Sequence, residues 1–251
     1  MADFAQESGH WYLPDSTPYY TVKGANGKER NVTLRDARKV GAYPSVTTVI
    51  RLAASPGLQQ WLIKTAIESA LTLPRIEGET SDAFLVRVEE DRKAQAKAAA
   101  DRGTLIHAAI EKHYRNDVVD ASWQPWIIEA VGEINKVCGN QVWKPERSFA
   151  DFRGYGGKTD LHSGEWVLDF KSIDKDVPKA IFEEQIMQLS AYREGLNIPG
   201  ARAGILYVQR ERPAATLIEA APGDLDKGWE CFKALLAYHQ AKNRYKPGVE
   251  L

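Results

Sequence analysis

Three strand-like runs follow one another directly in the second half of the chain. They cover roughly Val142 to Asp151, Gly157 to Leu161 and Glu165 to Ser172, separated by glycine-containing turns. Turns this short join antiparallel neighbours, because a parallel crossover needs a dozen or more residues. The runs therefore predict three consecutive strands, called the meander below, of which the last two form a hairpin at Ser163 and Gly164.

Helical patterns stand on both sides of this meander. The other predicted elements are helices at about Ser81 to Tyr114, from near Ser122 and Pro125, at about Ala180 to Leu196 and at about Asp224 to Ala241, with strands at Ala203 to Gln209 and Ala215 to Glu219. The core order is helix, three strands, helix, strand. This order predicts an α/β fold with a central mixed sheet flanked by helices.

Residues 1–43 have a different character, rich in aromatic and turn-forming residues. Two short runs flank Gly24-Ala25-Asn26-Gly27, which indicates a hairpin, and Thr33 to Asp36 fits a capping box before a helix. We therefore expect an accessory hairpin lobe at residues 1–43 and a main domain at 44–251 whose first half is helical.

Composition limits the classes of protein that this chain can belong to. No stretch approaches the ~18 apolar residues that a membrane helix needs, and the first residues lack a secretory or transit pattern. The expectation is a cytoplasmic protein of a bacterium or a phage-infected cell, neither secreted nor membrane-bound. Two cysteines are too few for a disulfide framework or a four-cysteine iron–sulfur cluster, so no such cluster is expected.

The last two strands of the meander gather acidic residues. In the run Trp166 to Lys171, Asp169 and Lys171 share one face of the sheet because side chains alternate along a strand. If Ser163 and Gly164 are the central turn residues, Asp160 pairs with Val167 and lies diagonal to Asp169 on that face, ~7–8 Å away. Two converging carboxylates repel unless they are protonated, hydrogen-bonded or bridged by a cation, and hard oxygen ligands suit Mg²⁺ or Mn²⁺.

An ordinary explanation competes with this one. An Asp-x-Lys strand alone is more often a solvated face with a weak ion pair. The formal net charge of −1 also counts mildly against a polyanionic partner without excluding one.

Four motifs in order favour the functional interpretation. Gly157-Lys158-Thr159-Asp160, eight residues and then Asp169-Phe170-Lys171 resemble the signature of the PD-(D/E)XK nuclease superfamily, in its RecB-like exonuclease branch. Arg102 to His107 resembles the upstream histidine motif of that branch, and Gln188 to Tyr192 resembles its QxxxY motif. Pro44-Ser45-Val46-Thr47 resembles a segment of phage and mitochondrial single-strand DNA exonucleases.

The resemblance implies a restriction-endonuclease-like core and roles for particular residues. Asp160, Asp169, a neutral His107 and the Phe170 carbonyl would hold Mg²⁺, for which Mn²⁺ substitutes, and Lys171 would help to activate the attacking water. Gln188 and Tyr192 would bind phosphate or position Lys171. Taken alone, His107 is more often a core histidine, and Gln188 with Tyr192 would be an exposed polar stripe. Glu146 is a candidate outer acid.

The expected function is a metal-dependent DNA exonuclease that leaves 5′-phosphates, in recombination, repair or DNA processing. Its substrate would be DNA with a free end, including single strands, and exposed aromatic residues such as Tyr19, Tyr20 or Trp61 would stack bases. A motor or a single-strand annealing partner would be a separate chain. The alternatives are a structure-specific or single-strand endonuclease, and a catalytically silent module that binds nucleic acid.

Overall fold

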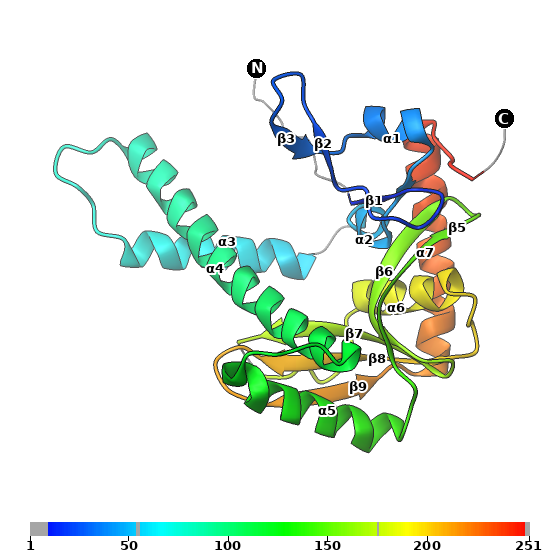
Figure 1. Cartoon of the computed structure of the whole chain (residues 1–251). Coiled ribbons are helices and arrows are strands. Elements are labelled where there is room, and N and C mark those ends of the chain that lie inside the picture. Colours follow the sequence, from blue (N-terminus) through cyan, green and yellow to red (C-terminus); the bar gives the residue numbers. More distant parts are fainter. Residues whose placement is uncertain (1–9, 54–55, 175, 249–251) are drawn as a thin grey trace.

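Five strands form a mixed sheet at the centre of the molecule (Figure 1). The computed structural model describes residues 10–53, 56–174 and 176–248. The strand order is β5-β6-β7-β8-β9, with bounds Lys144–Asp151, Tyr155–His162, Trp166–Ile173, Arg202–Gln209 and Ala215–Glu219. Neighbouring strands are antiparallel except β7 and β8, which are parallel. The predicted meander and mixed sheet are confirmed.

Helices cover both faces of this sheet. The helix α6 (Glu183–Gly195) connects the parallel strands β7 and β8, and α7 (Pro222–Asn243) packs beside it. Their apolar side chains share a core with Val167, Ile205 and Tyr207. The other face is covered by α4 (Ser81–Arg115) and α5 (Gln124–Cys138), which follows a short 3-10 turn, η1 (Ala121–Trp123).

The alternation along β7 explains why helices lie on both sides. Trp166, Leu168 and Phe170 enter the core beneath α4 and α5, whereas Val167 enters the core beneath α6 and α7. A strand buried on both faces is typical of a sheet covered by helices on both sides. The polar residues that follow Val167 on its face, Asp169 and Lys171, therefore lie beneath a helix.

The N-terminal segment forms a small lobe on top of this core (Figure 1). It contains β1 (Trp11–Tyr12), β2 (Thr21–Lys23), β3 (Glu29–Asn31), α1 (Leu34–Val40) and β4 (Tyr43–Pro44). The helix α2 (Val46–Ile50) follows the lobe and packs into the main core with α6 and α7. The hairpin β2–β3 and the capping box of α1 are present as expected: the Thr33 side chain caps the Asp36 amide, and the Asp36 carboxylate accepts from the Thr33 amide. Ser45 forms a parallel bridge with Gly156 of β6, which joins the lobe to the sheet.

A helical hairpin projects from the core (Figure 1). It is formed by α3 (Pro56–Thr72) and the first half of α4, whose second half returns to the sheet. Thr80 caps the start of α4, and Asn116 ends it in the left-handed region at φ 61°. None of the described helices has the length and apolar character needed to cross a membrane.

Candidate active site

Asp160 and Asp169 face each other across β6 and β7. Leu161 pairs with Leu168 and His162 pairs with Val167, so the next residues along the two strands, Asp160 and Asp169, are directly opposite. The predicted pairing of Asp160 with Val167 is wrong: Val167 pairs with His162, and Asp160 lies opposite Asp169, two residues further along β7. Because both strands shift together, the two carboxylates still share a face, and they are closer neighbours than the diagonal arrangement would make them.

The turn explains the shift. The Ser163 amide donates to the Trp166 carbonyl at 2.8 Å, so Gly164 and Glu165 are the central residues of the turn. The Ser163 hydroxyl accepts from the amides of Glu165 and Trp166 at 3.1 and 3.0 Å. A serine side chain that substitutes for backbone in this way moves the turn one residue along the chain.

The backbone pairing between β6 and β7 stops where the carboxylates begin. Leu161 and Leu168 are the last paired residues before Asp160 in the described part of this ladder. Beyond them, the Asp160 carboxylate accepts from the Phe170 amide at 2.6 Å. A side chain thus takes the place of a strand partner, which fixes the Asp160 carboxylate beside β7.

Two side chains contact the Asp169 carboxylate, and a third holds one of them in place. Lys171 Nζ lies 2.6 Å from Oδ2, and Gln188 Nε2 donates to Oδ1 at 2.9 Å. Gln188 also accepts from Lys171 Nζ at 3.2 Å and donates to the Tyr192 hydroxyl at 2.8 Å. Asp169 is only 4% exposed because α6 lies over this face. The interpretation of this strand as a solvated face, and of Gln188 and Tyr192 as an exposed stripe, is therefore wrong.

The Asp169 carboxylate perturbs the facing Asp160 carboxylate. Burial, and then the neighbouring Asp169 carboxylate, raises the pKa of Asp160 to about 8. Burial is the largest single influence on the pKa of Lys171 and lowers it, but the charge and hydrogen bond of Asp169 together with the charge of Asp160 outweigh burial, so the net shift is upward and Lys171 remains a cation at neutral pH. The Asp160 carboxylate is therefore stabilised by binding a proton or a cation, whereas Lys171 carries a fixed positive charge.

His107 approaches the same strands from α4, close enough to Asp169 and Lys171 for their charges to act on its imidazole. Its ring contacts the Phe170 ring edge to face, with 5.8 Å between ring centroids. Burial lowers the pKa of His107, so its imidazole is neutral at pH 7. Its Nε2 atom is buried and has no hydrogen-bond partner among the described residues. A core histidine would normally have found a partner for this nitrogen.

Gly103 brings α4 close to β7, one turn before His107. A methyl group on Gly103 would collide with the Ser172 hydroxyl. The glycine therefore permits a close approach of α4 to β7, which helps to set how closely His107 meets the sheet.

Glu146 is more central than its sequence context indicates. It lies on β5 between two paired residues, Pro145 opposite Leu161 and Arg147 opposite Thr159, and so stands across from Asp160. Its backbone adopts a left-handed conformation at φ 54°, which is uncommon for a residue with a side chain. Its carboxylate forms an ion pair with Lys158 and contributes to the raised pKa of Asp160. Neither its φ nor this ion pair can be read from residue spacing.

Comparisons with solved structures find distant likenesses. A candidate exonuclease from Eubacterium rectale matches with a TM-score of 0.41 at 13% identity, over 59% of this chain and 69% of that one. The alkaline exonuclease LHK-Exo from Laribacter hongkongensis also matches with a TM-score of 0.41, at 14% identity, over 83% of this chain and 92% of that one. No family model and no curated protein matches the sequence. Likenesses this distant assign no residue roles.

The donor set is compatible with a hard divalent cation. Asp160 and Asp169 supply carboxylate oxygens that face each other, and Lys171 Nζ lies 2.6 Å from the buried Asp169 Oδ2. No group of three or more His, Cys, Asp or Glu side chains close enough to share one metal occurs in the described part of the chain. The two aspartates are thus placed to bind a cation together, whereas in the described structure His107 does not form a three-residue metal-binding group with them.

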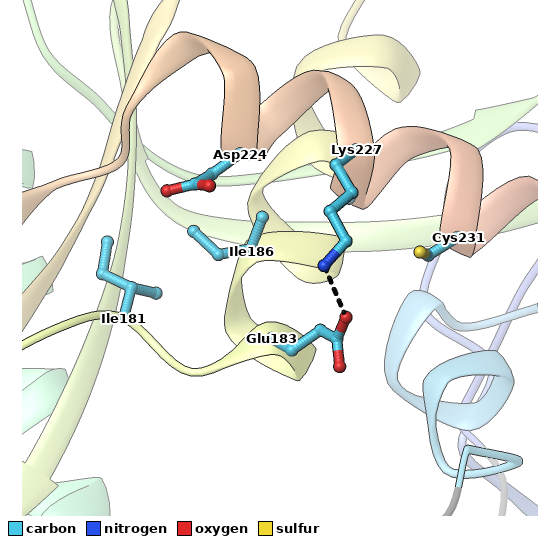
Figure 2. Close-up of a pocket in the computed structure, with 7 residues that line it drawn as sticks. Ile181, Glu183, Ile186, Asp224, Lys227 and Cys231 are labelled. Carbon is cyan, nitrogen blue, oxygen red and sulfur yellow. Dashed lines mark ion pairs between the residues drawn. The ribbon is translucent and has the colours of Figure 1, made fainter.

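A cavity of about 280 Å³ lies elsewhere, between the start of α6 and α7 (Figure 2). Glu183 and Lys227 form an ion pair across it at 3.3 Å, and Cys231 lies on its wall. None of the residues discussed above lines it. The cavity is therefore separate from the candidate active site, and its ion pair can serve as a control for substitutions in that site.

Proposed function

We propose that the chain is a metal-dependent DNA exonuclease that hydrolyses phosphodiester bonds and leaves 5′-phosphates, with a role in recombination, repair or DNA processing in the cytoplasm. The observation that carries the proposal is the meeting of Asp160, Asp169 and Lys171 on one buried face under Gln188. Two facing carboxylates, one of them Asp160 with a raised pKa, beside a fixed ammonium are the groups that phosphodiester hydrolysis requires.

Asp160, Asp169 and the Phe170 carbonyl would hold Mg²⁺ or Mn²⁺, with His107 as the nitrogen ligand in reach of the same strands. The bound cation would supply a more acidic water and neutralise charge on the phosphate. Hydrolysis breaks the P–O3′ bond. The water oxygen stays on the 5′-phosphate, and the leaving 3′-oxygen takes up a proton.

The protein's own side chains have distinct tasks in this reaction. Lys171, held as a cation by Asp169, stabilises the negative charge that builds on the phosphate oxygens. Gln188 holds Lys171 and Asp169 at once, and the Tyr192 hydroxyl fixes the Gln188 amide. Gln188 and Tyr192 are thus positioning residues in the unliganded site, and Asp160 is held by the Phe170 amide.

The test is to remove the charged groups one at a time. Purified protein should degrade linear DNA when Mg²⁺ is present and not in EDTA. Asp169→Asn and Lys171→Met should each lower kcat by about 10²- to 10⁴-fold, because each removes a group that acts on the reacting phosphate. Each substitution also leaves a buried charge without its partner, so the double variant Asp169→Asn/Lys171→Met serves to keep the fold intact.

Glu183→Gln and Lys227→Met provide matched controls, because they remove an ion pair at the cavity of Figure 2. Both should cut at the wild-type rate. If the folded double variant also degrades DNA at the wild-type rate, the proposed centre is wrong.

A further inference from the structure

An aromatic stack on the N-terminal lobe ends at an exposed histidine ring. The His10 and Tyr20 rings are stacked with 4.5 Å between centroids and 29° between planes. Tyr12 supports the far side of Tyr20, since its ring meets Tyr20 edge to face at 5.8 Å and the two hydroxyls are 2.8 Å apart. Tyr12 is buried, Tyr20 is partly buried and His10 is exposed. The stack therefore runs from the protein interior to an exposed ring, and within the described residues the ring contact of His10 is with Tyr20.

Two cations stand beside this stack. Arg51 and Lys158 both lower the pKa of His10, after the larger effect of burial, so both lie near the imidazole. Lys158 also interacts electrostatically with Tyr20. A planar surface next to two positive charges is the combination that binds a nucleobase and its adjoining phosphate. His10 itself is neutral at pH 7, so it offers a ring rather than a charge.

The stack is attached to the candidate active site. Tyr12 packs against Gly156 on β6, where a methyl group would lie 3.0 Å from the Tyr12 side chain. Lys158 forms the ion pair with Glu146, which stands across from Asp160. Tyr192 lies close enough to Tyr12 to contribute to its raised pKa, and Tyr20 lies close enough to Tyr192 to contribute to the raised pKa of Tyr192, both after the larger effect of burial. Neighbouring side chains thus connect the His10 ring to the Asp160 and Asp169 carboxylates.

The other aromatic residues considered from sequence do not share this arrangement. Tyr19 packs into the small core of the N-terminal lobe. The side chain of Trp61 lies outside the part of the chain that the structure describes. Tyr20 is the member of that group that reaches the site.

We propose that the open face of His10 stacks on a nucleobase of single-stranded DNA, while Arg51 and Lys158 bind the phosphate attached to it. This inference rests on the proposed nuclease function for its choice of ligand. It makes the N-terminal lobe part of the substrate-binding surface and assigns it the task of placing one nucleotide beside the scissile phosphate.

Binding of a short oligothymidylate that carries 2-aminopurine at successive positions tests the proposal without cleavage, in EDTA. One position should lose fluorescence on binding, because a stacked 2-aminopurine is quenched. His10→Ala should abolish that quenching and raise the Kd by about 5-fold or more, since a base stacked on an aromatic ring contributes about 5- to 150-fold to affinity. His10→Phe, which keeps a flat ring, should restore both signals.

A double-mutant cycle separates stacking from a structural effect. An abasic nucleotide at the quenched position should weaken binding by the wild-type protein but not weaken binding by His10→Ala further. His113→Ala removes another exposed histidine, on the last turn of α4, and should leave the affinity unchanged. Equal affinities of His10→Ala and wild type, or an equal abasic penalty in both proteins, would overturn the proposal.

The binding readout is independent of catalysis. If wild type shows quenching that His10→Ala abolishes, but wild type does not cleave DNA with Mg²⁺, this inference is supported and the nuclease function is refuted. If wild type cleaves DNA but no 2-aminopurine position is quenched on binding, the nuclease function is supported and this inference is refuted.

Discussion

Asp160 is a carboxyl group in an environment that favours its neutral form. Burial and the opposing Asp169 carboxylate raise its pKa to about 8, against about 3.9 in an unfolded chain. Between these two values the folded protein binds more protons than the unfolded one, so the free energy of unfolding falls as pH rises from about 4 to about 8. A cation that occupies the site takes the place of the proton and removes this cost.

We therefore expect Asp160→Asn to be more stable than wild type at pH 8 in EDTA, and the advantage to disappear toward pH 4. The amide keeps an oxygen that can accept from the Phe170 amide. Urea unfolding at a series of pH values measures the difference between the two proteins. The difference is the useful quantity because neutral His107 acts in the opposite sense, adding stability as pH rises toward about 6.5. Parallel pH profiles for the two proteins would contradict the assignment.

At the scale of elements, the contact between α4 and β7 depends on a glycine in the middle of a helix. Gly103→Ala should lower the free energy of unfolding by about 1–3 kcal/mol, because the added methyl group collides with Ser172 and pushes the helix off the strand. The same shift moves His107 away from Phe170, so cleavage activity should fall with stability. Chemical denaturation and a cleavage assay on the same samples measure both effects.

Gly132→Ala is the matched control, since Gly132 lies within α5 and a methyl group there meets nothing within 4 Å. It should raise the free energy of unfolding by up to about 1 kcal/mol through helix propensity. Adding Ser172→Ala to Gly103→Ala removes the hydroxyl from the collision and should restore part of the loss. A Gly103→Ala protein as stable as Gly132→Ala would show that the two elements do not meet at this glycine.

The same element scale shows where sequence reasoning succeeds and stops. The meander, the helices around it and the shared face of Asp160, Asp169 and Lys171 follow from local periodicity, and all are present. The hairpin register could not be obtained this way, because it depends on which groups the Ser163 side chain bonds. The left-handed backbone at Glu146 and the contact of Tyr12 with Gly156 arise from packing between distant segments, which leaves no periodic signal.

For the whole molecule, the position of the site bears on the kind of DNA that can reach it. Asp169, Gln188 and Tyr192 are 4%, 7% and 5% exposed. The N-terminal lobe and α6 approach the site from one side, and α4 with its projecting hairpin lies on the other side (Figure 1). A flexible single strand with a free end can be drawn into a recessed site, whereas a strand without an end has to enter as a bent loop, at an additional cost in conformational freedom.

We therefore expect an end requirement. Linear single-stranded DNA should be degraded in Mg²⁺, and a closed circle of the same sequence should persist under the same conditions, as followed by gel electrophoresis. Cutting that circle once with a sequence-specific enzyme should make it a substrate, which controls for base composition and for any inhibitor in the circular preparation. The products of the linear strand should carry 5′-phosphates that a phosphatase can remove. If the intact circle is nicked as fast as the linear strand is shortened, the chain is an endonuclease, and the recessed carboxylates accept looped DNA.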